Sequence, residues 1–176
     1  MGKYIIADNQ ELTRFALESL IRRDEANVVY KASDKAGLVE LLKDHEAAIV
    51  LLDYTLFDFA DEDQLLIVAE RFALSQWILI SDELTPQFLR RMVYASHQFS
   101  IVFKDGSMKD IRDALDAVNR HSRHISQRAL ETIITHQQEE DERPSILTET
   151  ETEIVRAIAQ GKTTKEIAVE RFSSVH

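Results

Sequence analysis

Five short apolar segments, separated by stretches with helical spacing, are the feature that most constrains the fold of this chain. The third segment reads AAIVLL, an unbroken apolar run typical of a strand that is buried on both faces. Strands that alternate with helices in this way predict a parallel, doubly wound α/β sheet with helices on both faces. The predicted strands are residues 4–7, 28–30, 48–52, 77–80 and 101–103.

The stretches between the strands repeat apolar residues three or four positions apart, which is typical of amphipathic helices. Helix starts are predicted at Thr85, which precedes Pro86, and at Ser107, which is followed three residues later by Asp110. The predicted apolar sides consist of Leu12, Phe15, Ala16 and Leu20; of Leu65, Leu66, Ala69 and Phe72; and of Ile111, Leu115 and Val118.

Composition excludes several classes of function. The 176 residues suffice for one ordinary domain and a small appendage, and a net charge of −10 argues against a large surface that coats nucleic acid. No apolar run approaches the roughly 20 residues that span a bilayer, so no membrane partner is expected. The absence of cysteine excludes disulfides and thiolate chemistry, and it is compatible with a cytoplasmic protein.

Polar side chains follow four of the predicted strands. Asp8 follows the first strand, Asp53 the third, Ser81 the fourth and Lys104 the fifth. In a sheet ordered 2-1-3-4-5 these strands are neighbours, so we expect the four side chains to converge at one edge. Each residue alone is explained equally well as a cap, a turn or a solvated side chain. Together they favour phosphoryl transfer to a carboxylate.

In that chemistry Asp53 is the nucleophile and becomes an aspartyl-phosphate. A hard cation such as magnesium, held by oxygen ligands, offsets the charge of the transferring group. The Ser81 hydroxyl and the Lys104 ammonium are then placed to bind the phosphoryl oxygens.

The same segments resemble the receiver domains of two-component response regulators of the NarL/FixJ/LuxR branch over about residues 3–120. The matching stretches are IIADNQELTRFALESLI, AAIVLLDYTLFD, WILISDE and FKDGS. The resemblance implies a flavodoxin-like fold, phosphorylation by a sensor histidine kinase, and Asp53 as the phospho-acceptor. It also implies Mg²⁺ bound by Asp8, Asp53 and the backbone carbonyl of Thr55, a hydroxyl switch at Ser81 and a phosphate-binding lysine at Lys104.

Three departures from the family pattern leave two readings open. Asn9 replaces the second carboxylate of the acidic pair, Ile101 stands at the aromatic switch position, and residues 57–60 replace the usual glycine-containing loop. Either phosphorylation persists with weaker metal binding, or the chain is an atypical, phosphorylation-independent receiver that acts as a protein-interaction module. If the switch operates, its route is expected to run from Ser81 to the surface between Thr85 and Asp113.

Two competing classes fit the residues less well, and the chain is not expected to be an enzyme. A phosphatase of the haloacid dehalogenase type needs a second aspartate where this chain has Thr55. A flavodoxin-like cofactor binder needs a neutral phosphate-binding loop after the first strand, whereas Asp8, Asn9 and Glu11 make that loop acidic.

Residues 147–176 resemble the opening of a LuxR-type helix-turn-helix. Thr148 with Glu151 and Thr163 with Glu166 form two predicted capping boxes, and Gly161 is placed to end the first helix. A generic helical hairpin is the plainer alternative. The resemblance implies DNA contacts at Lys162, Thr163, Lys165, Ser174 and His176.

The expected organisation is a receiver domain over 1–120, a helical and acidic linker over 121–146, and a partial helix-turn-helix over 147–176. Ser174 matches the N-cap of the recognition helix, so that helix is expected to be missing. The last segment carries four basic and five acidic side chains, too little positive charge for DNA affinity. We therefore expect a truncated form whose full-length parent binds DNA as a homodimer.

Overall fold

The computed structural model describes residues 1–142 and, beyond these, residues 153–154, 156–158, 160–161, 163, 165–166 and 168–169. The chain divides into two compact units, Met1–His136 and Gln137–His176. Within the described part of the chain, no helix is both long enough and apolar enough to span a bilayer.

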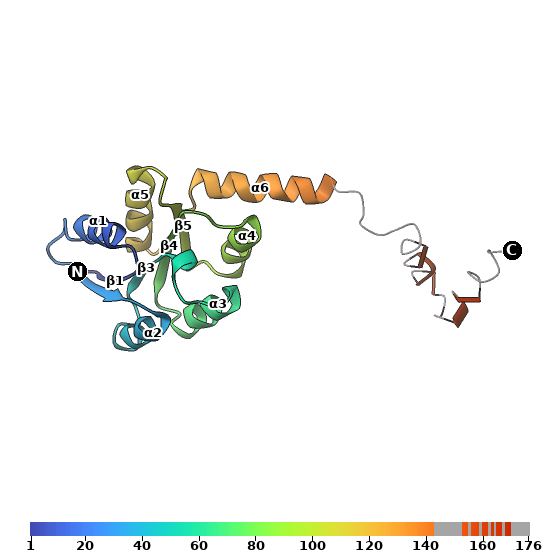
Figure 1. The fold of residues 1–176 in the computed structure, drawn as a ribbon, viewed down its shortest axis with the longest axis horizontal. Helices are drawn as coiled ribbons and strands as arrows, with labels where there is room; N and C mark the ends of the chain where they lie inside the picture. Colours follow the sequence, from blue (N-terminus) through green and yellow to red (C-terminus); the bar gives the residue numbers. More distant parts are fainter. Residues whose placement is uncertain are drawn as a thin grey trace. The chain divides into compact units, whose positions relative to one another are not determined.

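The first unit is built on a five-stranded parallel sheet with the strand order β2-β1-β3-β4-β5 (Figure 1). Each predicted strand is present, and the predicted order is confirmed. The strands are β1 (Lys3–Ala7), β2 (Val28–Ala32), β3 (Ile49–Leu52), β4 (Gln76–Ser81) and β5 (Phe99–Phe103).

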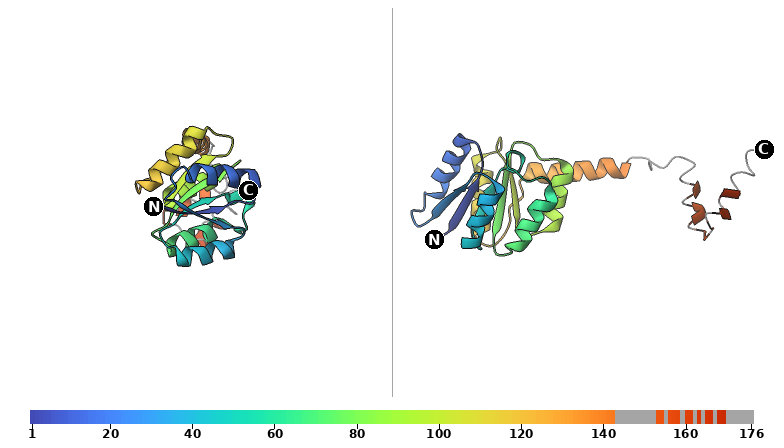
Figure 2. Two further views of the ribbon diagram at one scale, coloured as in Figure 1. Left: turned by 90° about the vertical axis from the view of Figure 1, so that its left-hand side faces the viewer. Right: turned by 60° about the horizontal axis from the view of Figure 1, so that its bottom comes forward.

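Helices cover both faces of this sheet, as Figure 2 shows in the view along its edge. One apolar cluster joins the sheet to α1 and α5 through residues such as Leu17 and Ile111, and a second joins it to α2, α3 and α4 through residues such as Leu65 and Leu89. The elements are α1 (Glu11–Ile21), α2 (Lys35–Asp44), the short 3-10 helix η1 (Tyr54–Leu56), α3 (Glu62–Arg71), α4 (Pro86–Ala95) and α5 (Met108–Asn119).

The predicted helix starts at α4 and α5 are confirmed. The Thr85 hydroxyl accepts the Phe88 backbone N–H at 3.2 Å, and Pro86 follows it in the first turn. The Ser107 hydroxyl accepts the Asp110 N–H at 3.1 Å. These side chains satisfy backbone donors that have no partner within the helix.

The predicted apolar side of α1 is mostly wrong, since of its larger residues only Leu20 packs against the core. Leu12 and Phe15 are 82% and 70% exposed, whereas Leu17 and Ile21 are buried against the sheet. Apolar residues occur around most of this helix, so two stripes satisfy the three-to-four spacing. The position of α1 over β1 and β3, which the helix sequence does not specify, decides which stripe faces the core.

The chain that follows α5 belongs to the first unit, whose boundary at residue 136 does not coincide with the expected domain end at residue 120. Ile125 forms a parallel bridge with Ile101 at the outer edge of β5. Helix α6 (Gln127–Glu142) then begins, and its Ala129 and Ile133 are buried in the same apolar cluster as α4 and β5. The helix also continues to Glu142, through most of the acidic run of the segment predicted to be a helical and acidic linker.

In the second unit, the described residues agree with two of the predicted helix signals. Gly161 has a φ of +79°, the left-handed conformation in which a glycine ends a helix without steric cost. Thr163 and Glu166 form the predicted reciprocal capping box, with a Thr163 N–H to Glu166 carboxylate distance of 2.7 Å. The predicted box of Thr148 and Glu151 lies outside the described residues.

Candidate functional site

Asp53 lies directly after β3, at the carboxyl end of the sheet, and its side chain is fully buried. Its backbone N–H donates to the Ala7 carbonyl at 3.0 Å, which ties the residue to the end of β1. One carboxylate oxygen, Oδ1, accepts the Thr55 N–H at 3.1 Å, the Thr55 hydroxyl at 2.8 Å and the Ser81 hydroxyl at 3.0 Å. Three donors hold this carboxylate in one orientation.

Lys104 reaches the other oxygen of Asp53 from the end of β5. Its Nζ contacts Asp53 Oδ2 closely, lies 3.0 Å from Asp8 Oδ2 and donates to Gln10 Oε1 at 2.8 Å. Burial lowers the pKa of this lysine, but hydrogen bonds to Asp53 and Asp8 and the charges of both carboxylates outweigh burial and raise it. Lys104 is therefore a permanent cation at neutral pH.

Asp8 is 1% exposed and completes what we call the carboxylate cluster, formed by Asp8, Asp53, Ser81 and Lys104. Its Oδ1 accepts the Gln10 N–H at 2.7 Å. Its Oδ2 is buried and, within the described part of the chain, receives no hydrogen bond of good geometry, although it lies within ion-pair distance of Lys104. The four residues that the sequence singled out are thus brought together.

The donor set of the cluster fits a divalent cation. Two buried carboxylates share one ammonium, which leaves an excess negative charge at the cluster. Hard cations such as Mg²⁺ prefer oxygen ligands of this kind. Asn9 sits beside the cluster, and its amide donates to the Leu56 carbonyl at 3.0 Å.

Ile101 is fully buried in β5, so it presents no side chain at the surface. Its N–H donates to the His124 carbonyl and its carbonyl accepts the Ser126 N–H, each at 2.9 Å. The segment between α5 and α6 therefore occupies the edge of β5 at residue 101.

Two groups near the cluster were missed by the sequence analysis. Gln10 is a contact of Lys104, and Asp105, next to Lys104, is an ion-pair partner of Arg128 on α6. Gln10 could have been found from its place in the loop after β1. Nothing in the local sequence pairs Asp105 with a residue 23 positions away.

The predicted DNA contacts are only partly within the described chain. Thr163 and Lys165 are exposed, and Thr163 is engaged in its capping box. Lys162, Ser174 and His176 lie outside the described residues.

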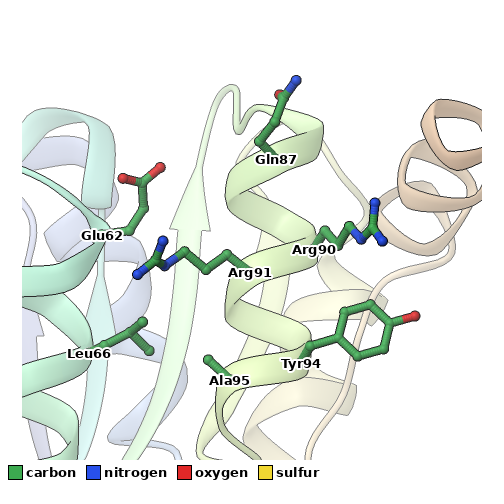
Figure 3. Close-up of a pocket in the computed structure, with 7 residues that line it drawn as sticks. All are labelled: Glu62, Leu66, Gln87, Arg90, Arg91, Tyr94 and Ala95. Carbon is green, nitrogen blue, oxygen red and sulfur yellow. The ribbon is translucent and has the colours of Figure 1, made fainter. Parts of the chain in front are cut away.

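A hollow between α3 and α4 lies apart from the carboxylate cluster (Figure 3). Two of its polar side chains are already engaged: Arg91 pairs with Asp63 of α3, and Gln87 contacts His136 of α6 at 3.1 Å. None of the predicted site residues lines it. Its lining residues are Glu62, Leu66, Gln87, Arg90, Arg91, Tyr94 and Ala95.

Comparison with solved structures defines the class of fold. The isolated receiver domain of RcsB from Salmonella enterica serovar Typhimurium, studied with a phosphomimetic, matches with a TM-score of 0.65 and 20% identity, over 75% of this chain and 98% of that one. A LuxR-family response regulator from Aurantimonas matches with a TM-score of 0.67 and 17% identity, over 78% and 98% of the two chains. The first unit therefore has the flavodoxin-like fold of a response-regulator receiver domain, as the sequence resemblance implied.

Proteins that resemble the chain over nearly its whole length include a transcriptional regulatory protein and a response regulator. The chain is 27% identical over 181 residues to YvfU of Bacillus subtilis, described as an uncharacterized transcriptional regulatory protein. The match covers 99% of this chain and 84% of that one. An RcsB response regulator of Salmonella typhimurium matches with a TM-score of 0.70 and 21% identity, over 97% and 84% of the two chains. No family model matches the chain.

Proposed function

We propose that the chain is a two-component response regulator that controls transcription and receives a phosphoryl group on Asp53. The observation that carries this proposal is the carboxylate cluster: a buried aspartate, oriented by three donors, contacts a lysine cation at the carboxyl end of a receiver-type sheet. The donor is a phosphorylated sensor histidine kinase or a small acyl phosphate, and the chain is a phosphate acceptor rather than an enzyme with a separate substrate.

In the transfer, a carboxylate oxygen of Asp53 forms a bond to phosphorus while the bond from phosphorus to the donor's leaving atom breaks, and the leaving group keeps that electron pair. Lys104 and the Ser81 hydroxyl are placed to bind the phosphoryl oxygens. Asp8, Asp53 and the Thr55 carbonyl would hold Mg²⁺, with Asn9 as a neutral and therefore weaker position. The ion neutralises charge on the transferring group when it is bound.

Acetyl phosphate tests the proposal on the intact chain. With Mg²⁺, the wild-type protein is expected to gain the mass of one phosphoryl group. Asp53→Asn should gain none, while Asp82→Asn, a matched change at an exposed aspartate after β4, should behave as wild type. Uptake by Asp53→Asn, or no uptake by the wild-type chain, contradicts the assignment.

The alternative is a phosphorylation-independent receiver that acts as a protein-interaction module. It is favoured by Asn9 in place of a carboxylate and by the burial of Ile101 beneath the segment that leads to α6. No phosphoryl uptake under any donor or Mg²⁺ concentration would favour this alternative.

We infer a DNA-binding role for the second unit from the capping box of Thr163 and Glu166 and from the resemblance to regulators of transcription. RcsB dimers are described bound to DNA, and a homodimer is the arrangement that paired half-sites call for. Lys162, Thr163, Lys165, Ser174 and His176 are the proposed contacts. In a protein that contains this unit, Lys165→Ala should weaken DNA binding and reduce the slope of affinity against salt by about one ion.

A further inference from the structure

Lys104 is carried by a tight turn between β5 and α5. The Gly106 N–H donates to the Phe103 carbonyl at 3.1 Å, which closes the turn around Lys104 and Asp105. A Cβ on Gly106 would lie 2.9 Å from that carbonyl oxygen, too close for another residue without a backbone shift. The Lys104 N–H donates to the Ser81 carbonyl at 3.1 Å, so the turn is also tied to the end of β4.

Arg128, near the start of α6, contacts the residues on both sides of Lys104, Phe103 and Asp105. Its Nη1 donates to both oxygens of Asp105, at 2.6 and 2.8 Å. Its guanidinium lies 4.2 Å from the centre of the ring of Phe103, which is itself 4% exposed. A planar cation suits this combination of a carboxylate contact and a ring contact.

The start of α6 has a fixed position relative to β5. The two hydrogen bonds of Ile101 to His124 and Ser126 attach the preceding segment to the strand, and the Ser126 hydroxyl accepts the Ala129 N–H at 3.3 Å. Ile133, one turn after Ala129, is buried in the core. The backbone at Arg128 is therefore held in place, because it lies two residues after Ser126, the last residue bonded to the edge of β5.

We propose that Arg128 is a positioning residue for the carboxylate cluster, acting through the turn that holds Lys104, so that phosphorylation of Asp53 and the docking of α6 are coupled. This inference rests on the proposed function. When Lys104 exchanges its contacts with the Asp53 carboxylate for contacts with a phosphoryl group, Asp105 and Phe103 move with it, and Arg128 transmits the change to α6. Coupling of this kind is reciprocal, because each site then changes the other's equilibrium by the same factor.

The proposed coupling runs through Asp105 and Arg128 and not through the side chain of residue 101. Ile101 only attaches the segment before α6 to β5, whereas the contact between Arg128 and Asp105 that is expected to change lies at the surface. The side chains of Arg128 and Asp105 are 51% and 62% exposed, and exposed ion pairs contribute little to global stability. An Arg128 variant should therefore fold normally, so that a change in its rate of phosphoryl uptake reports the role of Arg128 in that reaction.

The test compares wild type, Arg128→Ala, Arg128→Lys and the control Arg120→Ala, an exposed arginine at the end of α5. The first readout is the rate of phosphoryl uptake from acetyl phosphate with Mg²⁺. We expect Arg128→Ala to be about fivefold slower, since the lost contact is an exposed one of modest strength. Arg128→Lys should recover part of the rate, and Arg120→Ala should match wild type.

The second readout is amide hydrogen exchange over residues 127–136, with and without phosphorylation. In the wild-type chain, phosphorylation should change exchange in this part of α6 at least about twofold. In Arg128→Ala this response should be lost, whereas a purely structural role would alter exchange equally in both states.

The outcomes separate the two proposals. If the wild-type chain is phosphorylated but Arg128→Ala reacts at the rate of Arg120→Ala, or its α6 still responds, the role of Arg128 is contradicted and the acceptor assignment stands. If the wild-type chain takes up no phosphoryl group, both proposals are contradicted.

Discussion

The carboxylate cluster and the edge of β5 are held together by different forces, although they meet at Lys104. In the cluster, two buried carboxylates share one ammonium, and each charge depends on its partner. At the edge of β5, backbone hydrogen bonds and the buried side chains of Ala129 and Ile133 hold α6, while the charged contact of Arg128 lies at the surface.

Because of this difference, substitutions in the carboxylate cluster and substitutions in α6 should have different consequences for phosphoryl uptake. A charge removed from the buried cluster leaves its partners unpaired in a poorly solvated place, which is costly and disables the site. An apolar group removed from α6 costs packing energy but leaves the cluster's own contacts in place. Four variants, taken from the largest expected effect to the smallest, test this contrast.

Lys104→Met removes the cation that Asp8 and Asp53 share. We expect the free energy of unfolding at pH 7 to fall by about 3 kcal/mol, because an uncompensated buried charge remains. Phosphoryl uptake should fall to background. Chemical denaturation and mass measurement check the two effects, and Lys109→Met, an exposed lysine 81% accessible on α5, is the control.

The same variant has a pH signature. The folded-state pKa of Lys104 lies above the ordinary lysine value of 10.5, so its stabilisation is fully present below that value and is lost as pH rises through the raised pKa. The stability difference between wild type and Lys104→Met should therefore be constant near neutral pH and shrink only above 10.5. A difference that shrinks near pH 8 would contradict the ion pairing.

Ile133→Ala tests the attachment of α6. Ile133 is 6% exposed, and its truncation should lower the free energy of unfolding by about 2–4 kcal/mol through lost burial and a cavity. Ile134→Ala, at the adjacent 55% exposed position, should change stability by less than about 0.5 kcal/mol. Equal effects of the two substitutions would contradict the packing of Ile133 in the apolar core.

Asn9→Asp supplies the carboxylate that the acidic pair lacks. We expect Mg²⁺ affinity, measured by titration calorimetry, to rise on the order of tenfold, because a hard cation gains a charged oxygen ligand. Asn9→Ala removes the hydrogen bond to the Leu56 carbonyl without adding charge and should not raise the affinity. An unchanged affinity in Asn9→Asp would place the ion elsewhere.

Glu18→Gln is expected to have the smallest effect. Hydrogen bonds to Lys31 and then to Arg22 lower the pKa of Glu18, so its stabilisation is present at neutral pH and is lost as pH falls below its ordinary value of 4.5. Because the pair is partly exposed, the substitution should cost less than about 1 kcal/mol at pH 7. In acid titrations of stability, the cost should shrink as pH falls below 4.5 and vanish once pH lies below the lowered pKa of Glu18.

The carboxylate cluster could be predicted from sequence because each of its residues is placed by a strand end. A polar residue at the end of a buried strand has its position fixed by the sheet, and the strand order brings Asp8, Asp53, Ser81 and Lys104 together. For these four residues, the local sequence pattern and the strand order predict the same position in the fold.

Other features depend on tertiary contacts that local pattern does not contain. The spacing of Leu12 and Phe15 is as good as that of Leu17 and Ile21, and only the placement of α1 on the sheet selects the second pair. The pairing of Ile101 with Ile125 likewise joins distant residues, so the end of the first unit could not be found from composition.

The most direct test of the central claim, that Asp53 and its partners form a phosphoryl-binding site, is the ¹⁹F spectrum of the chain with beryllofluoride, a phosphoryl mimic. The account predicts bound resonances that require Mg²⁺ and disappear in both Asp53→Asn and Lys104→Met. No bound resonance in the wild-type chain, or bound resonances that persist in Asp53→Asn, would contradict it.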